Sequence, residues 1–263
     1  MNADPELNAM IIAALSESGF DGFEETEDKL IAYANTKNAD HVAAESLLRE
    51  MNISFIRTET EEQNWNALWE SNFPPIEMDD FVHIRADFHQ AKKGFDHEII
   101  ITPKMSFGTG HHATTYSMIK AMRLLNFTNK SVCDYGTGTG VLAILAEKLG
   151  AAEVLAIDND DWSIENAAEN FKRNNCQRIS IIKEDSINEK NKFDIVLANI
   201  NRNVLLENMK NIADAVKPKG DILLSGFYTE DIPTLLECTN NCSLTLISQA
   251  VNNNWVCLHL KKN

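Results

Sequence analysis

In the first 58 residues, short segments with the apolar spacing of a helix alternate with short segments that are typical of strands. Apolar positions recur on one face of a helix near the start, and Gly19 follows as its stop signal. The expected elements are a helix over 7–15, strands over 20–26 and 29–34, a helix over 39–51 and a strand over 53–58. This order lacks only a leading strand to be a ferredoxin-like βαββαβ unit. We therefore predict a small ferredoxin-like α+β domain at residues 1–62, with its first strand missing.

An aromatic stripe marks the segment that follows. Trp65, Trp69 and Phe73 recur every four residues, which places them on one face of a helix. Pro74 and Pro75 end that helix, because proline cannot continue the backbone hydrogen bonding. We predict a linker helix over 63–75 whose aromatic side chains pack between two domains.

The pattern changes from residue 80 onward, where strand patterns at 81–86 and 97–102 precede a helix that starts near residue 112. Strand patterns at 131–135, 153–157, 179–183, 193–198 and 220–225 then alternate with helical stretches. Such alternation predicts a parallel sheet with helices on both faces. The last two strand patterns, 243–249 and 255–260, are too close for a helix between them and should form an antiparallel hairpin. The fold class is therefore α/β and Rossmann-like over 76–263, with an ending more typical of methyltransferases than of dehydrogenases.

The sharpest local motif is VCDYGTGTGVLAILAEKLGA at 132–151. A buried strand ends at Asp134, and Gly136, Gly138 and Gly140 form a turn that lets a ligand approach the backbone closely. The GxGxG spacing differs from the GxGxxG dinucleotide fingerprint, and no GK[ST] follows to make a P-loop. An acid two residues before the first glycine suits a ligand with an ammonium group, such as the amino-acid end of S-adenosylmethionine.

Two further polar residues follow predicted strands. Asp158 lies 22 residues after Gly136, where an acid accepts both ribose hydroxyls of an adenosine. NAD and S-adenosylmethionine share that requirement, so Asp158 does not choose between them. Asn199 ends the strand FDIVLAN, at the edge where open α/β sheets bind ligands. In methyltransferases that act on nitrogen, two prolines and an aromatic residue often follow this position. Ile200 and Asn201 replace the two prolines here, so the sequence does not fit that subclass.

The segment KMSFGTGHHATT at 104–115 combines two glycines, two histidines and two threonines just before a predicted helix. It could cover a cofactor, with a threonine hydroxyl reaching the ligand from the helix start. The alternative is a helix-entry loop in which His111 or His112 acts as a cap.

The charge and the cysteine content of the chain limit the kinds of partner and ligand that it is expected to bind. The 263 residues carry 24 basic and 39 acidic side chains, a net charge of −15, and residues 1–62 alone carry −10. Such a surface repels nucleic-acid phosphates and attracts a basic partner, although acidic charge can also serve solubility. Five dispersed cysteines, with Cys238 and Cys242 one helical turn apart, predict neither disulfides nor a metal site. Without a signal peptide or an apolar run of ~20 residues, we expect a cytoplasmic protein with no membrane contact.

These motifs together resemble PrmA, the ribosomal-protein-L-eleven methyltransferase family. The matching stretches are MSFGTGHHATT, DYGTGTGVLAILAEKLGA, AIDNDDWSIENAAENFKRN and ANI, in that order. The resemblance implies S-adenosylmethionine as cofactor and assigns its contacts to Thr115, Gly136, Asp158 and Asn199, with no catalytic residue assigned. It further implies methyl transfer to lysine ε-amines and the N-terminal α-amine of a basic large-subunit ribosomal protein, which the small N-terminal domain recognises.

Two other functions fit parts of the pattern. A methyltransferase for a free small molecule would use the same motifs, with the N-terminal domain as a lid. A nicotinamide-dependent oxidoreductase is disfavoured by the GxGxG spacing and by the terminal hairpin.

Overall fold

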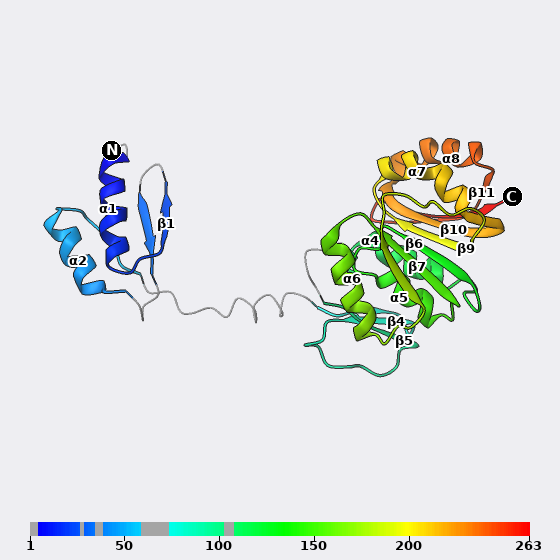
Figure 1. Cartoon of the computed structure of the whole chain (residues 1–263), viewed down its shortest axis with the longest axis horizontal. Helices are drawn as coiled ribbons and strands as arrows, with labels where there is room; N and C mark the ends of the chain where they lie inside the picture. The colour runs from blue at the N-terminus through cyan, green and yellow to red at the C-terminus, as the bar shows by residue number, and fades with distance from the viewer. Residues whose placement is uncertain (1–4, 27–28, 35–38, 59–73, 103–107) are drawn as a thin grey trace. The chain divides into compact units, whose positions relative to one another are not determined.

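The structure is a computed structural model that describes residues 5–26, 29–34, 39–58, 74–102 and 108–263 (Figure 1). The chain divides into two compact units, residues 1–64 and 65–263. The aromatic stripe of the predicted linker helix, at 65, 69 and 73, lies outside the described residues.

The first unit pairs two helices with a small antiparallel hairpin. Its described elements are α1 (Pro5–Glu17), β1 (Gly22–Glu25), β2 (Leu30–Tyr33) and α2 (His41–Glu50). Ile11, Leu15 and Ala44 form its buried core, because the apolar faces of both helices point inward. All four of these elements were predicted from the sequence.

The prediction of a strand over residues 53–58 is wrong. Residues 53–58 form no strand, and Ile56 at the centre of the segment is 93% exposed. Asn52 turns the chain back with a φ of 58°, and the N–H of Ile53 then donates to the carbonyl of Leu48 in α2. Ile53 packs on the core of the unit at the end of α2. Its side chain is therefore apolar because it packs there, and not because it pairs in a sheet.

The second unit is built on a seven-stranded sheet of order β11-β12-β10-β9-β6-β7-β8. The central strands are parallel, and β12 runs antiparallel to both β10 and β11, as the sequence predicted. The strands are β6 (Ser131–Tyr135), β7 (Glu153–Asp158), β8 (Ile179–Lys183), β9 (Phe193–Asn199), β10 (Val216–Tyr228), β11 (Leu244–Asn252) and β12 (Trp255–Lys262).

Helices cover both faces of this sheet, because successive strand residues point to opposite sides. Val132 of β6 belongs to the core under α4 (Ala113–Met122), α5 (Val141–Lys148) and α6 (Asp161–Arg173). Cys133, the next residue, belongs to the core under α7 (Arg202–Ala215) and α8 (Ile232–Asn241), which follows the short 3₁₀ turn η1 (Thr229–Asp231). Figure 1 shows α7 and α8 together on one side of the sheet. In the described part of the chain, none of the helices has the length and apolar character to cross a membrane.

A separate three-stranded sheet extends the first of these cores. It consists of β3 (Ile76–Met78), β4 (Val82–Arg85) and β5 (His97–Ile100), with β4 and β5 parallel and β3 antiparallel to β4. The sequence predicted β4 and β5 but neither β3 nor the separation of this sheet from the large one. Its apolar side chains, including Val82, Ile84 and Ile99, are buried with those of α4 and α5.

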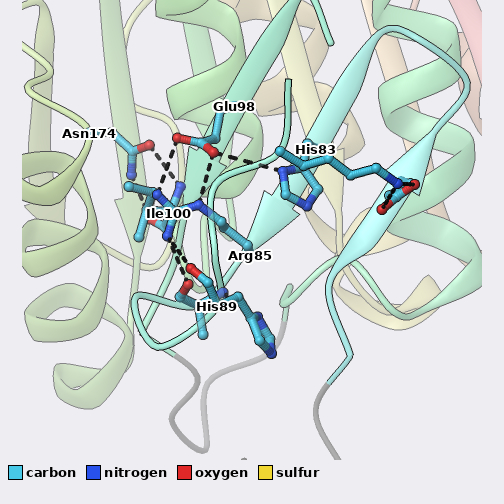
Figure 2. A network of polar contacts seen from close by, with 9 residues as sticks. His83, Arg85, His89, Glu98, Ile100 and Asn174 are labelled. Carbon is cyan, nitrogen blue, oxygen red and sulfur yellow. Dashed lines mark hydrogen bonds and ion pairs between the residues drawn. The ribbon is translucent and has the colours of Figure 1, made fainter. Parts of the chain in front are cut away.

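A polar network attaches the small sheet to α6 (Figure 2). Arg85 donates two hydrogen bonds to the carboxylate of Glu98, at 2.9 and 3.2 Å, and this contact lowers the pKa of Glu98. Asn174, directly after α6, accepts from the N–H of Ile100 at 2.9 Å and donates to its carbonyl at 2.6 Å. The side-chain amide thus completes the hydrogen bonding of a strand edge, as a neighbouring strand would.

Gly226 permits a close crossing at the end of β10. The pairing of β10 with β12 shifts register between Ser225 and Phe227, and Gly226 between them has a φ of 101°. A Cβ at Gly226 would lie 2.1 Å from the carbonyl oxygen of Ile200, the residue directly after β9. The crossing therefore requires glycine for space as well as for backbone conformation.

Gly226→Ala should lower the free energy of unfolding by about 3 kcal/mol, because it adds a steric clash to the strain of a positive φ. Gly94→Ala is the matched control, since Gly94 has a φ of 102° and nothing within 4 Å of the added methyl group. That control should cost about 1–2 kcal/mol. Urea unfolding of both variants gives the comparison. Equal losses would show that the Ile200 contact adds nothing.

Candidate cofactor-binding site

Three strand ends meet at one edge of the large sheet. Tyr135 of β6 pairs with Ile157 of β7 on one side and with Ala198 of β9 on the other. The next residue on each strand is Gly136, Asp158 and Asn199, respectively. The parallel register therefore brings together three of the residues that the sequence singled out, at the edge where such sheets bind ligands.

The glycine turn is closely packed at Gly136. The N–H groups of Gly136 and Thr137 donate to the carbonyl of Ile157 at 2.8 and 2.9 Å, which fixes the start of the turn. Gly136 has a φ of 74°, and a Cβ there would lie 2.1 Å from Cγ2 of Ile200. Gly140 caps α5 with a φ of 80° and packs closely on Phe171 of α6. The turn is thus compact, and its first glycine presents bare backbone at the sheet edge.

Asp134 lies inside the turn. Its carboxylate accepts from the hydroxyl of Thr137 at 2.6 Å and from the N–H of Ala143 at 3.1 Å. The side chain is buried, and that burial raises the pKa of Asp134 to about 7. Asp134 therefore holds the turn against the first turn of α5. Its carboxyl also titrates in a range where a nearby cation would favour the charged form.

Asp158 retains acceptor capacity. One carboxylate oxygen accepts from the N–H of Gly138 at 2.9 Å and the other from the N–H of Asp160 at 3.1 Å. A carboxylate offers about four acceptor positions, so these two bonds leave room for two further donors. The group is half-buried at the tip of β7, where a pair of ribose hydroxyls could reach it.

Asn199 presents an unsatisfied acceptor. Its Nδ2 donates to Oγ1 of Thr115 at 3.3 Å, and both side chains are buried. Its Oδ1 is also buried and has no hydrogen-bond partner among the described residues. A buried acceptor without a partner lowers the free energy of unfolding by about 1–3 kcal/mol, and a hydrogen bond from a ligand N–H or O–H would remove that penalty. Thr115 joins the other three predicted residues through this contact.

The segment before α4 is described from residue 108, so residues 104–107 of the sequence motif lie outside the described part. His112 is the N-cap of α4 and accepts from the N–H of Thr114, as the helix-cap alternative proposed. His111 contacts the carbonyl of Pro74 through Nε2 at 2.9 Å. A cleft of about 440 Å³ opens beside this segment, lined by Ile76, Gly110, His111, Ala113, Tyr116, Asn252 and Asn253.

The match to known proteins is extensive. The family model described as "Ribosomal protein L11 methyltransferase (PrmA)" matches residues 11–263. The chain is 41% identical to the ribosomal protein L11 methyltransferase of Porphyromonas gingivalis over 259 residues, which cover 95% of this chain and 89% of that protein. The corresponding protein of Phocaeicola vulgatus is 37% identical over 95% of this chain and 92% of its own length.

The chain belongs to the ribosomal protein L11 methyltransferase family.

A solved structure agrees with this membership. The crystal structure of the ribosomal protein L11 methylase from Lactobacillus delbrueckii subsp. bulgaricus is 27% identical, with a TM-score of 0.66 over 72% of this chain and 99% of that one. A putative RNA methyltransferase from Pyrococcus horikoshii, 17% identical with a TM-score of 0.51 over 61% of this chain and 91% of its own, shares the fold. The Rossmann-like methyltransferase fold predicted from the sequence is confirmed.

Several residues of the site were not singled out from the sequence. The side chain of Ile200 covers Gly136. Thr139, within the glycine turn, and Asn170 of α6 form hydrogen bonds there, and Phe171 packs on Gly140. One signal was available. Asn166, Asn170 and Asn174 recur every four residues on the predicted helix, which places three amides on one face. Within the described residues, no group of three or more His, Cys, Asp or Glu side chains is placed to hold a metal ion.

Asp134→Asn should remove part of the pH dependence of the free energy of unfolding. The folded-state pKa of Asp134 is about 7, above the reference value of 3.8, so the folded chain holds an extra proton between those values. Unfolding releases it, and the contribution of Asp134 to stability falls as pH rises through that window, by up to about 1.4 kcal/mol per pH unit. Urea unfolding at pH 5 and pH 8 should show a smaller loss in the variant than in the wild type. Parallel losses in the two proteins would contradict the assignment.

Proposed function

We propose that the chain transfers methyl groups from S-adenosylmethionine to amines of ribosomal protein L11, its targets being lysine ε-amines and the N-terminal α-amine. Family membership supports a protein methyltransferase. The main support for the site is the strand register: three strand residues pair side by side, and Gly136, Asp158 and Asn199 are the residues that follow them. Thr115 adjoins these residues through Asn199.

The chemistry of these residues fits the cofactor. S-adenosylmethionine supplies a methyl group on a positively charged sulfur, together with an amino-acid end and an adenosine. Gly136 has no side chain that would hinder close approach of the amino-acid end to the backbone of the turn. The remaining acceptor positions of Asp158 suit two ribose hydroxyls. Asn199 and Thr115 lie on the other side of Gly136 from Asp158, because β6 lies between β9 and β7 in the sheet.

The incoming amine must be neutral to attack the methyl group. A free lysine has a pKa of about 10.4, so burial and a neighbouring positive charge have to lower it. The buried Oδ1 of Asn199 accepts an N–H from the neutral amine, which points the nitrogen lone pair away from the amide. Water takes the proton that the lysine ammonium must lose. The contribution of the chain is to hold the amine nitrogen and the methyl carbon about 3 Å apart.

The acidic N-terminal region suits a basic protein substrate. Residues 1–62 carry a net charge of −10, which attracts a basic ribosomal protein and repels nucleic acid. We assign substrate recognition to residues 1–62, the connection to residues 63–75 and methyl transfer to residues 76–263. A substrate of this kind places the protein in the cytoplasm.

Intact-protein mass spectrometry tests the proposal. Unmodified bacterial ribosomal proteins are incubated with the full chain and S-adenosylmethionine, and a parallel sample omits the cofactor. L11 should gain mass in steps of one methyl group, and the other ribosomal proteins should not. If S-adenosylmethionine binds but no ribosomal protein gains mass, the substrate is wrong and a small-molecule acceptor is favoured. Binding of NADH in place of S-adenosylhomocysteine would overturn the cofactor as well.

Asp158→Ala should weaken binding of S-adenosylhomocysteine by about 1–3 kcal/mol, because it removes the acceptors for two ribose hydroxyls. Asp161→Ala is the control. Asp161 is a nearby acid that pairs with Lys183 at 2.7 Å and is 74% exposed, outside the proposed site. Isothermal calorimetry on both variants should show a loss for Asp158→Ala alone. Unchanged affinity in Asp158→Ala would show that the adenosine lies elsewhere.

A further inference from the structure

Residues 108–112, here named the α4 entry segment, are held from two sides. On one side, Oγ1 of Thr139 in the glycine turn donates to the carbonyl of Gly108 at 2.6 Å. On the other side, a Cβ at Gly110 would lie 2.8 Å from the terminal methyl groups of both Ile76 and Ile84 in the small sheet. The segment is therefore confined between the glycine turn and the small sheet.

A hydrogen bond holds the α4 entry segment to the glycine turn. Gly108 has a φ of 101°, and a Cβ there would lie 3.0 Å from Oγ1 of Thr139. The Thr139 side chain is fully buried, so its hydroxyl needs a partner inside the protein. Among the described residues, the carbonyl of Gly108 is the acceptor that it finds.

The backbone of Thr139 is fixed independently of its side chain. Nδ2 of Asn170 donates to the carbonyl of Thr139 at 2.8 Å, and Oδ1 of Asn170 accepts from the N–H of Thr102 at 2.8 Å. Asn170 is fully buried on α6, one helical turn before the Asn174 amide that binds Ile100 in Figure 2. Removal of the Thr139 hydroxyl should thus release the entry segment from the glycine turn without disturbing the turn itself.

The entry segment leads directly into the helix turn that carries Thr115. It ends at His112, the N-cap of α4, and Thr115 lies in the first turn of that helix. Thr115 in turn accepts the hydrogen bond from Asn199 at 3.3 Å. A continuous series of contacts therefore joins the glycine turn to the Thr115–Asn199 pair through the entry segment.

We propose that the Thr139 hydroxyl is a positioning group for methyl transfer: by holding the entry segment to the glycine turn, it aligns Thr115 and Asn199 with the cofactor. The inference rests on the proposed function for its catalytic consequence and on the Thr139–Gly108 hydrogen bond for its structural one. It requires the hydroxyl itself and not only the volume of the side chain.

Three variants separate the hydroxyl from the side-chain volume. Thr139→Val keeps the shape and removes the donor, whereas Thr139→Ser keeps the donor. Thr239→Val is the matched control, because Thr239 is also buried and its hydroxyl donates to a backbone carbonyl, that of Leu236, at 3.0 Å within α8. Thr239→Val should therefore lose comparable stability and retain activity.

We expect Thr139→Val to lower kcat by about tenfold to a hundredfold, since small misplacement of reacting groups is costly. The Kd of S-adenosylhomocysteine should change by less than about threefold, because the turn backbone is retained. Thr139→Ser should restore kcat to within about twofold. Equal losses of kcat in the Val and Ser variants, or none in Val, would overturn the proposal.

Hydrogen exchange gives a second readout that does not need an active enzyme. Backbone amides of residues 108–118 should exchange faster in Thr139→Val than in Thr239→Val at matched stability. If the wild-type chain transfers no methyl group, the proposed function fails, and exchange still decides whether Thr139 holds the entry segment. Unchanged exchange in Thr139→Val would refute the positioning role whatever the activity shows.

Discussion

The parallel pairing of β6 with β7 and β9 is the constraint on which the candidate site depends. Because Tyr135 pairs with both Ile157 and Ala198, the residues that follow on the three strands end at one level of the sheet. A shift of one residue in either pairing would turn every side chain of that strand to the opposite face and bury the wrong group. Apolar residues that alternate between the two cores hold this register, so packing on both faces of the sheet sets the geometry of the edge where the three strands end.

Polar groups buried near that edge are satisfied from different elements. Asp134 accepts from the turn that it precedes and from α5, and Asn170 links α6 to both Thr139 and Thr102. A buried amide or carboxyl is costly without partners, so each of these groups fixes the distance between the segments it joins. Asn199 differs, because the oxygen of its amide has no partner among the described residues. A site that binds a ligand must leave some such capacity open, and here it lies beside Thr115.

The sequence determined the order of elements and most of the candidate site, because those features are local. Helical and strand periodicity identified the alternating core, and short spacing identified the terminal hairpin. The glycine spacing and the acid after the second strand of the large sheet located Gly136 and Asp158, since the backbone of a turn and the tip of a strand have direct residue signatures. The strand over 53–58 failed because a local apolar pattern cannot distinguish a sheet partner from closure against α2.

Contacts between distant segments were decided by the tertiary structure. The crossing of Gly226 over Ile200, the cover of Ile200 on Gly136 and the hydrogen bond from Thr139 to Gly108 join residues that are up to 64 positions apart in the sequence. The separation of β3, β4 and β5 into their own sheet also depends on which edges pair, and strand propensity does not specify a partner. The sequence by itself determined which residues offer binding chemistry. The packing of the two cores decided which of them meet, because only the folded chain brings segments far apart in sequence within hydrogen-bonding distance.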